Sequence, residues 1–131
     1  MKRGWAQKGM TLVEVLVATF VIVVAVVALM AGFLSGLLLV ESGKNMAVAA
    51  ADARAVFEEM RRLSASGLPS VAGRNWTTWS RNAGLTGLTN ENVTVNFRNP
   101  AADPLEATVR VNWTQRDRNR SFTFTGLVTQ R

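Results

Sequence analysis

The sequence contains neither cysteine nor histidine among its 131 residues. Without cysteine the chain forms no disulfide, so cysteine usage gives no information about the redox compartment in which the protein works. Zinc sites built from these residues, catalytic dyads with histidine and thiol chemistry are excluded for the same reason. We therefore expect no metal site, no cofactor and no enzymatic activity.

Proline is scarce and is absent before Pro69, and no charged residue occurs from Val15 to Val40. Roughly 20 helical residues are enough to cross the hydrocarbon of a bilayer. A secretory signal peptide has a shorter apolar core and ends at a small-residue cleavage site, which this run lacks. The pattern predicts a membrane-spanning helix. Lys2, Arg3 and Lys8 precede it, and this basic tip predicts a cytoplasmic N-terminus.

This tip supplies +3 of the net charge of +6 and is interpreted first as a membrane-orientation signal and not as a nucleic-acid surface. Inside the apolar run, Gly32 and Gly36 form a G-x-x-x-G pattern. Two interpretations of this pattern stay open. It marks a close helix–helix contact, or it reflects the general abundance of small residues in membrane helices.

A different pattern follows the apolar run. Apolar residues now recur at steps of three and four, as on one face of an amphipathic helix; they are Met46, Ala49, Ala53, Val56, Met60 and Leu63. Ser66, Gly67 and Pro69 then supply a stop signal. We predict one helix from about Thr11 to Leu63, roughly 80 Å long at about 1.5 Å per residue. Its first half faces lipid and its second half packs on a soluble head.

Residues 64–131 predict a small antiparallel β head. The stretch 64–92 is rich in Ser, Gly, Asn and Thr and predicts a loop; because it contains Trp76 and Trp79, which need burial, it should wrap onto the head. Alternating apolar and polar residues predict strands at 93–97, 107–114 and 121–128, separated by turn-like segments at 99–104 and 115–120. The expected inward residues are Val93, Val95, Phe97, Ala107, Val109, Val111, Trp113, Phe122 and Phe124.

A three-stranded sheet of this size is unstable alone, so we expect its apolar face to pack on the apolar face of the helix. The predicted fold is therefore α+β. A long N-terminal helix spans the membrane with its first half and packs with its second half on a small antiparallel meander.

Glu14 stands at the entrance to the apolar run. A charged side chain near the centre of a bilayer costs roughly 2.5–3.5 kcal/mol on insertion scales, so an acid inside a membrane segment indicates a function. The alternative is that Glu14 lies at the interface and reaches into headgroups or water.

The residues "KGMTLVEVLVA" (8–18) end a short basic leader and open a long apolar helix. They closely resemble the type IV prepilin signature, which type IV pilins, type II secretion pseudopilins and competence pseudopilins share. The resemblance implies that a prepilin peptidase cuts after Gly9 and that the same enzyme methylates the new N-terminal residue, Met10. It also implies that Glu14, fifth in the mature chain, pairs with the Met10 ammonium of a neighbouring subunit. Low dielectric strengthens such a pair, and desolvation offsets part of the gain.

The segment "VRVNWTQRDRNRSFTFTGLV" (109–128) is similar in order to minor pilins of the V type and minor pseudopilins of the I type, which lie at or near a fibre tip and help to start assembly. The chain lacks the two cysteines that often staple the head of a major pilin, and it lacks the mid-span proline. The resemblance implies a leader (1–9), a filament-core helix (10–40), an amphipathic helix (41–63) and a β head (64–131).

The same resemblance implies a location and a set of partners. The precursor sits in the bacterial inner membrane with its head outside the cytoplasm, and later joins a periplasmic or cell-surface filament. Its partners are other pilin or pseudopilin subunits, the prepilin peptidase, an inner-membrane assembly platform and, before assembly, membrane lipid. The N-terminal signature does not distinguish a pilus from a secretion or a competence machine.

Three rival functions are weaker. Paired acids for an enzyme would come from Asp103, Glu106 and Asp117, but these lie in turns or at strand ends and are explained as solvated loop charges. Another rival is an unrelated single-span membrane protein with an extracytoplasmic sheet, which predicts no cleavage after Gly9.

The other rival is a nucleic-acid-binding tip. Arg110, Arg116, Arg118 and Arg120 cluster near Trp113 along the last hairpin, and in a competence-type fibre they would bind phosphates. However, Trp113 falls on the buried side of its strand, which removes the stacking platform, and Asp117 dilutes the charge. An ordinary solvated hairpin is the preferred interpretation.

Overall fold

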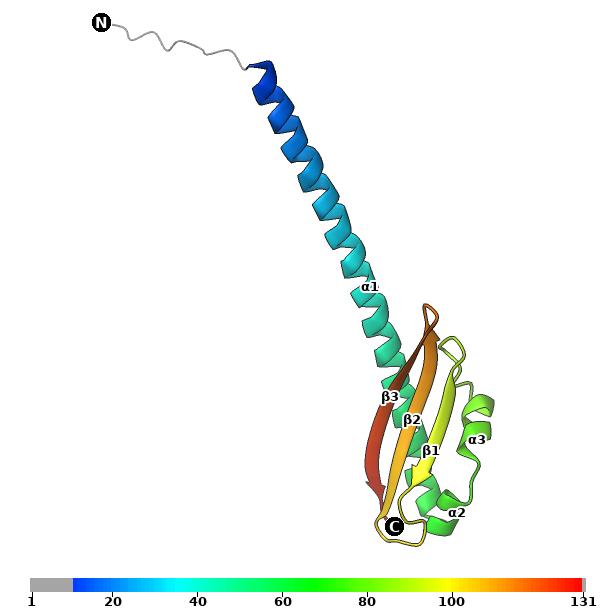
Figure 1. Ribbon diagram of the computed structural model, residues 1–131. Helices are drawn as coiled ribbons and strands as arrows, with labels where there is room; N and C mark the ends of the chain where they lie inside the picture. The colour runs from blue at the N-terminus through cyan, green and yellow to red at the C-terminus, as the bar shows by residue number, and fades with distance from the viewer. Residues whose placement is uncertain (1–10, 131) are drawn as a thin grey trace, which may run out of the picture. The chain divides into compact units, whose positions relative to one another are not determined.

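A computed structural model describes residues 11–130 of the chain. Its elements are α1 (Leu12–Ser64), α2 (Leu68–Ala72), α3 (Trp76–Asn82), β1 (Asn92–Phe97), β2 (Leu105–Gln115) and β3 (Arg118–Val128) (Figure 1). The predicted α+β fold is confirmed, because a long N-terminal helix packs on a small antiparallel sheet. The described chain divides into two units between Glu41 and Ser42. We call the second unit the head.

The N-terminal part of α1, in the first unit, is apolar and exposed. Every large hydrophobic side chain from Leu12 to Val40 is at least 44% exposed. Within the described chain, α1 is the one helix long and apolar enough to cross a membrane, which fits a single span. None of its most apolar window is buried inside the protein, unlike the core helix of a soluble protein.

The head contains a three-stranded antiparallel sheet in the order β1-β2-β3, as the sequence predicts. Val111 of the central strand lies opposite Val93 of β1 and Phe122 of β3, so all three strands contribute to one inner face. The inner residues of β2 are all buried; they are Leu105, Ala107, Val109, Val111 and Trp113. The two-residue alternation of the central strand is therefore confirmed.

Residues 42–64 of α1 lie across this inner face (Figure 1). The buried residues of the helix are Ala49, Ala53, Val56, Phe57, Met60 and Ser64. Two details of the predicted stripe are wrong. Met46 is 44% exposed, because burial begins only at Ala49, and Phe57 is buried although the stripe omitted it. A helix packed on a sheet buries a face at least about 100° wide, so the neighbour of Val56 is buried as well.

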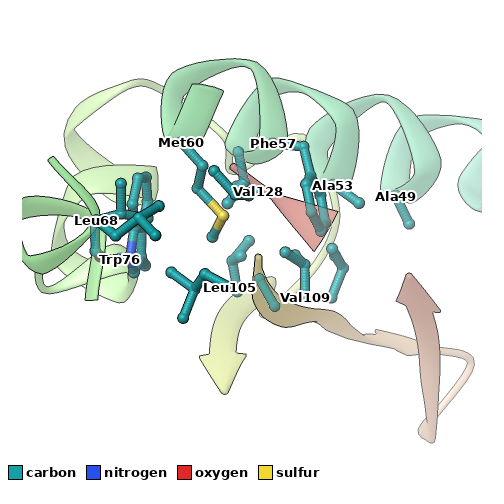
Figure 2. Close-up of a cluster of buried hydrophobic side chains, with 14 of the residues drawn as sticks. Ala49, Ala53, Phe57, Met60, Leu68, Trp76, Leu105, Val109 and Val128 are labelled. Atoms are coloured by element: carbon teal, nitrogen blue, oxygen red, sulfur yellow. Dashed lines mark hydrogen bonds between the residues drawn. The ribbon is translucent and has the colours of Figure 1, made fainter. Parts of the chain in front are cut away.

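Met60 occupies the middle of the core. Figure 2 shows its side chain directed from α1 toward Leu105, with Leu68 and Trp76 at one side of it. All four side chains are buried, Met60 and Leu105 completely. The core therefore joins α1, β2, α2 and α3, and is not confined to the helix–sheet contact.

The edge strand β3 is covered less well than expected. Phe122 and Phe124 belong to the inner face by register, but Phe124 remains 42% exposed. Its ring packs edge-on against Phe57 with 5.0 Å between centroids. A Cβ atom at Gly126 would lie 2.9 Å from the Phe57 ring, so this contact requires glycine in β3.

The predicted loop at 64–92 is wrong in detail, because it contains two short helices. Ser64 ends α1, Pro69 lies in the first turn of α2, where its missing N–H is not needed, and Asn75 caps α3. The Asn75 Oδ1 accepts a hydrogen bond of 2.9 Å from the Thr78 amide. Helices this short have no clear apolar period, whereas their proline and cap residues resemble turn signals.

The expectation that the tryptophans are covered is confirmed. Trp76 is buried and its Nε1 donates to the Val71 carbonyl at 2.9 Å, while Trp79 is partly buried. The two indole rings pack edge-on, with 5.6 Å between their centroids. The Thr77 hydroxyl donates to the Val93 carbonyl at 2.8 Å, which holds α3 beside β1 (Figure 1).

Candidate assembly site at the start of α1

Glu14 lies in the first turn of α1 and is exposed. Its backbone nitrogen lies 3.3 Å from Thr11 Oγ1, and the Val15 nitrogen lies 3.2 Å from the Thr11 carbonyl oxygen. Thr11 is therefore the N-cap of α1, and Glu14 stands three residues later, as in a capping box. A carboxylate in the first turn also interacts favourably with the helix dipole. Sequence reasoning missed this cap, although Thr-x-x-Glu before an apolar run was its signal.

Between Val15 and Val40 the polar side chains are those of Thr19 and Ser35, and both form hydrogen bonds within the helix. The Thr19 hydroxyl donates to the Val15 carbonyl at 2.7 Å, and the Ser35 hydroxyl donates to the Ala31 carbonyl at 2.9 Å. Such bonds let a hydroxyl enter lipid without an unsatisfied donor. Glu14 is the one charged residue of α1 before Glu41.

Gly32 and Gly36 lie four residues apart, one above the other on one face of α1. Apart from the adjacent residues and backbone of the helix itself, a Cβ atom at either position would meet no atom within 4 Å. The fold of this chain therefore does not require glycine at these positions, and a packing role would involve another molecule. Both interpretations from the sequence stay open. Gly9 and Met10 lie outside the described residues, so cleavage and methylation stay predictions.

The arginines of the last hairpin do not form one surface. Arg120 lies opposite Trp113, which places it on the inner face, whereas Arg110 lies opposite Thr123 on the outer face. Arg118 shares the inner face with Arg120. The sequence brings these side chains close along the chain, but the sheet register separates Arg110 from Arg118 and Arg120.

The tip of that hairpin is the two-residue turn of Arg116 and Asp117, with φ angles of 51° and 57°. These left-handed values match the twist of a tight β-hairpin. Trp113 is only 3% exposed, so it offers no face on which a base would stack. The geometry favours the solvated-hairpin interpretation over a nucleic-acid site.

The three acids considered for catalysis are not brought together. Glu106 lies near the start of β2, where its carboxylate is 3.4 Å from the Arg98 guanidinium. Asp117 follows the other end of β2, roughly 35 Å away at about 3.3 Å per residue. Asp103 lies in the connection between β1 and β2. Asp117 therefore cannot act together with the other two.

A charged cluster on the head was missed from the sequence. Glu59 Oε1 lies 2.7 Å from the guanidinium of Arg62 and 2.7 Å from that of Arg74. The Arg74 guanidinium also lies 5.5 Å and 5.7 Å from the ring centres of Trp76 and Trp79. The hydrogen bonds of Arg62 and Arg74 lower the pKa of Glu59 from 4.5 to about 2, against the opposing effect of burial. This cluster ties the segment before α3 to α1.

Arg74→Ala should lower the free energy of unfolding by about 1–3 kcal/mol, because it removes a charge-assisted hydrogen bond and two cation–π contacts. Since the pKa of Glu59 is depressed, its contribution is present above pH 4.5 and is lost as the pH falls toward 2. Urea unfolding of the full chain in detergent between pH 2 and 6 measures both effects. Arg61→Ala is the control, because its pair with Glu58 is exposed and should contribute below about 0.5 kcal/mol. Equal losses in the two variants would contradict this role of Arg74.

Comparisons with protein-family models, curated proteins and solved structures found no match to this chain. The fold and the exposed apolar helix define an α+β protein with one helix that fits a membrane span. A more specific function depends on the pattern of residues 8–18 and on the geometry around Glu14.

Proposed function

We propose that this chain is a minor structural subunit of a type IV filament or of a related secretion pseudopilus, without catalytic activity of its own. The observation that carries the proposal is the placement of Glu14 within the pattern of residues 8–18. It opens a helix whose large hydrophobic side chains are all exposed as far as Val40 and which carries no further charge over that length. A single membrane span needs only the apolar helix, and helix capping alone accounts for an acid in its first turn; the pattern of residues 8–18 is what supports pairing of Glu14 with a neighbouring subunit.

In this proposal the exposed side chains of α1 contact lipid first and the helices of neighbouring subunits later. Cleavage after Gly9 removes the basic leader and leaves an ammonium group on Met10. That group and the Glu14 carboxylate of a neighbour then neutralise each other in a medium of low dielectric. The pair sets the register of a subunit as it enters the bundle, and the N-cap by Thr11 keeps the first turn of α1 formed.

The proposal places the precursor in the bacterial inner membrane, with its N-terminus cytoplasmic and its head outside. The partners are other pilin or pseudopilin subunits, the prepilin peptidase that methylates Met10, and an inner-membrane assembly platform. Binding of DNA by the arginines of the last hairpin is the weaker alternative, because Trp113 is buried and Arg110 lies on the other face of the sheet.

The mass of the intact protein from its native membrane tests the proposal. A prepilin-like subunit has lost residues 1–9 and carries one added methyl group on Met10. An unrelated single-span protein keeps the leader, so a chain that retains residues 1–9 contradicts the proposal.

Gly9→Val should leave the precursor uncleaved, because a branched side chain before the scissile bond obstructs access to it. The measurement is an immunoblot of the membrane fraction, in which precursor and mature chain separate by size. Gly4→Val is the matched control, since Gly4 is also a leader glycine but lies away from the bond, and it should be processed normally. Normal processing of Gly9→Val would count against cleavage at this position.

A further inference from the structure

Asp52 of α1 and Glu91, just before β1, form a buried carboxyl pair in the head. Both residues are partly buried, and the Glu91 carboxyl lies within hydrogen-bonding reach of Asp52. Glu91 Oε2 accepts a hydrogen bond of 2.9 Å from the Leu88 amide. Asp52 Oδ2 and Glu91 Oε1 are shielded from solvent and have no hydrogen-bond partner among the described residues. Two buried carboxylate oxygens without donors are unfavourable unless a proton lies between them.

The pair lies where the segment 85–91, which connects α3 to β1, packs against α1. We call this segment the α3–β1 loop. A Cβ atom at Gly87 would lie 3.3 Å from Val48 of α1, and Leu88 is buried. On the other side the Thr89 carbonyl accepts a hydrogen bond of 2.8 Å from the Thr114 amide of β2. The loop is therefore held on both sides, and the carboxyl pair is its polar contact with α1.

No cation compensates the pair within the described residues. The groups that act on the Glu91 carboxyl are the amides of Leu88 and Gly87 and the carboxyl of Asp52. Lys44 and Arg54 of α1 are exposed, as is Arg120, which faces inward from β3, and Arg110 of β2 lies on the outer face. Burial, with a smaller effect of Asp52, raises the pKa of Glu91 to about 7 against the opposing effect of the two amides.

We propose that Asp52 and Glu91 share a single proton, and that loss of this proton loosens the α3–β1 loop from α1. With one proton, one carboxyl donates to the other and no buried like charges face each other. Without it, two carboxylates repel each other across the contact. This pH-dependent loosening of the α3–β1 loop is a property of the head and does not depend on the proposed filament assembly.

The sign of the pH dependence follows from the raised pKa. Between pH 4.5, the ordinary value for a glutamate, and about 7, the folded head binds more protons at Glu91 than the unfolded chain does. The stabilisation is complete below this range and is lost as the pH rises through it. The head should therefore be more stable at pH 5 than at pH 8.

The test uses the full chain in detergent and two readouts at pH 5, 6, 7 and 8. The first is the thermal midpoint of the head, and the second is hydrogen exchange of the Leu88 amide, corrected for the intrinsic effect of pH. We expect the wild-type midpoint to fall with rising pH and Leu88 exchange to rise about tenfold between pH 6 and 8. Glu91→Gln and Asp52→Asn should each flatten both profiles, because an amide donates where the proton did.

Glu58→Gln is the control, because Glu58 is an exposed acid of the same helix, and this variant should keep the wild-type profile. A flat wild-type profile, or a slope that persists in Glu91→Gln, overturns the proposal. Should Glu91→Gln fail to fold, the carboxyl carbon shift of Glu91 in the wild-type protein decides. Titration of that carbon near pH 4.5 overturns the shared proton, and titration near pH 7 supports it.

Discussion

Glu14→Ala should abolish incorporation of this chain into filaments while the chain is still made, inserted and folded. The substitution removes the carboxylate that neutralises the ammonium of a neighbouring subunit, and this ammonium would then be buried alone among apolar side chains. Each 1.4 kcal/mol lost from a contact weakens it tenfold, and an unpaired buried charge costs more than that. We therefore expect at least a tenfold fall in the amount of this chain in sheared filaments, relative to its amount in the membrane.

Two variants separate pairing from helix capping, the local role that the structure gives to the same turn. Thr11→Ala keeps the carboxylate but removes the side chain that accepts from the Glu14 amide, at a cost of about 1 kcal/mol to the helix end. It should still assemble. Glu14→Gln keeps a side chain of nearly the same size and the same backbone hydrogen bond to Thr11 but lacks the charge, and it should fail like Glu14→Ala. Wild-type amounts of Glu14→Ala in filaments, or a mature chain that begins at Met1, would refute the assembly proposal.

Met60→Ala should lower the free energy of unfolding of the head by about 2–5 kcal/mol. Met60 is completely buried. Its side chain extends from α1 toward Leu105, with Leu68 and Trp76 at one side (Figure 2). Truncation leaves a cavity that the surrounding helices and sheet cannot fill. Since small domains are stable by only about 5–15 kcal/mol, this single change removes a large share of the total. Urea unfolding followed by tryptophan fluorescence, with the full chain in detergent, measures the loss.

Met46→Ala is the matched control. It removes the same side chain from the same helix, but Met46 is 44% exposed and lies before the first buried residue, Ala49. We expect a change within about 0.5 kcal/mol. Equal effects of the two variants would mean that α1 packs on the sheet through the face the sequence pattern predicts, with Met46 inside it.

The sheet and the second part of α1 were predictable because each depends on a regular period, and the first part was predictable from the length of its uncharged apolar run. The alternation of Val109, Val111 and Trp113 is the period of a strand with one buried face, and it placed the central strand correctly. The two helices between Ser64 and Asn92 were not predictable in this way. With 5 and 7 residues they are too short for an apolar period, and tertiary contacts of Trp76 and Thr77 hold them in place.

The polar contacts of the head were not predictable from spacing. Glu59 and Arg74 are fifteen residues apart, and Asp52 and Glu91 are farther apart still, so only the fold brings them together. Both acids of α1 looked like ordinary residues of a solvated helix face. Glu14 is the opposite case. Its unusual position was visible from the uncharged run of sequence that follows it, whereas its capping partner Thr11, three residues away, was overlooked.

The hydroxyls of Thr19 and Ser35, each bonded to a carbonyl one turn earlier, make the apolar half of α1 self-sufficient in hydrogen bonding. Lipid tails and the side chains of other helices are similarly apolar, so moving such a segment from one to the other changes its free energy little. In an assembly built on this segment, transfer of the apolar helix from lipid into a helix bundle would therefore contribute little net free energy. In the proposed filament, the direction of growth then comes from charge neutralisation at one end and from work done by other components.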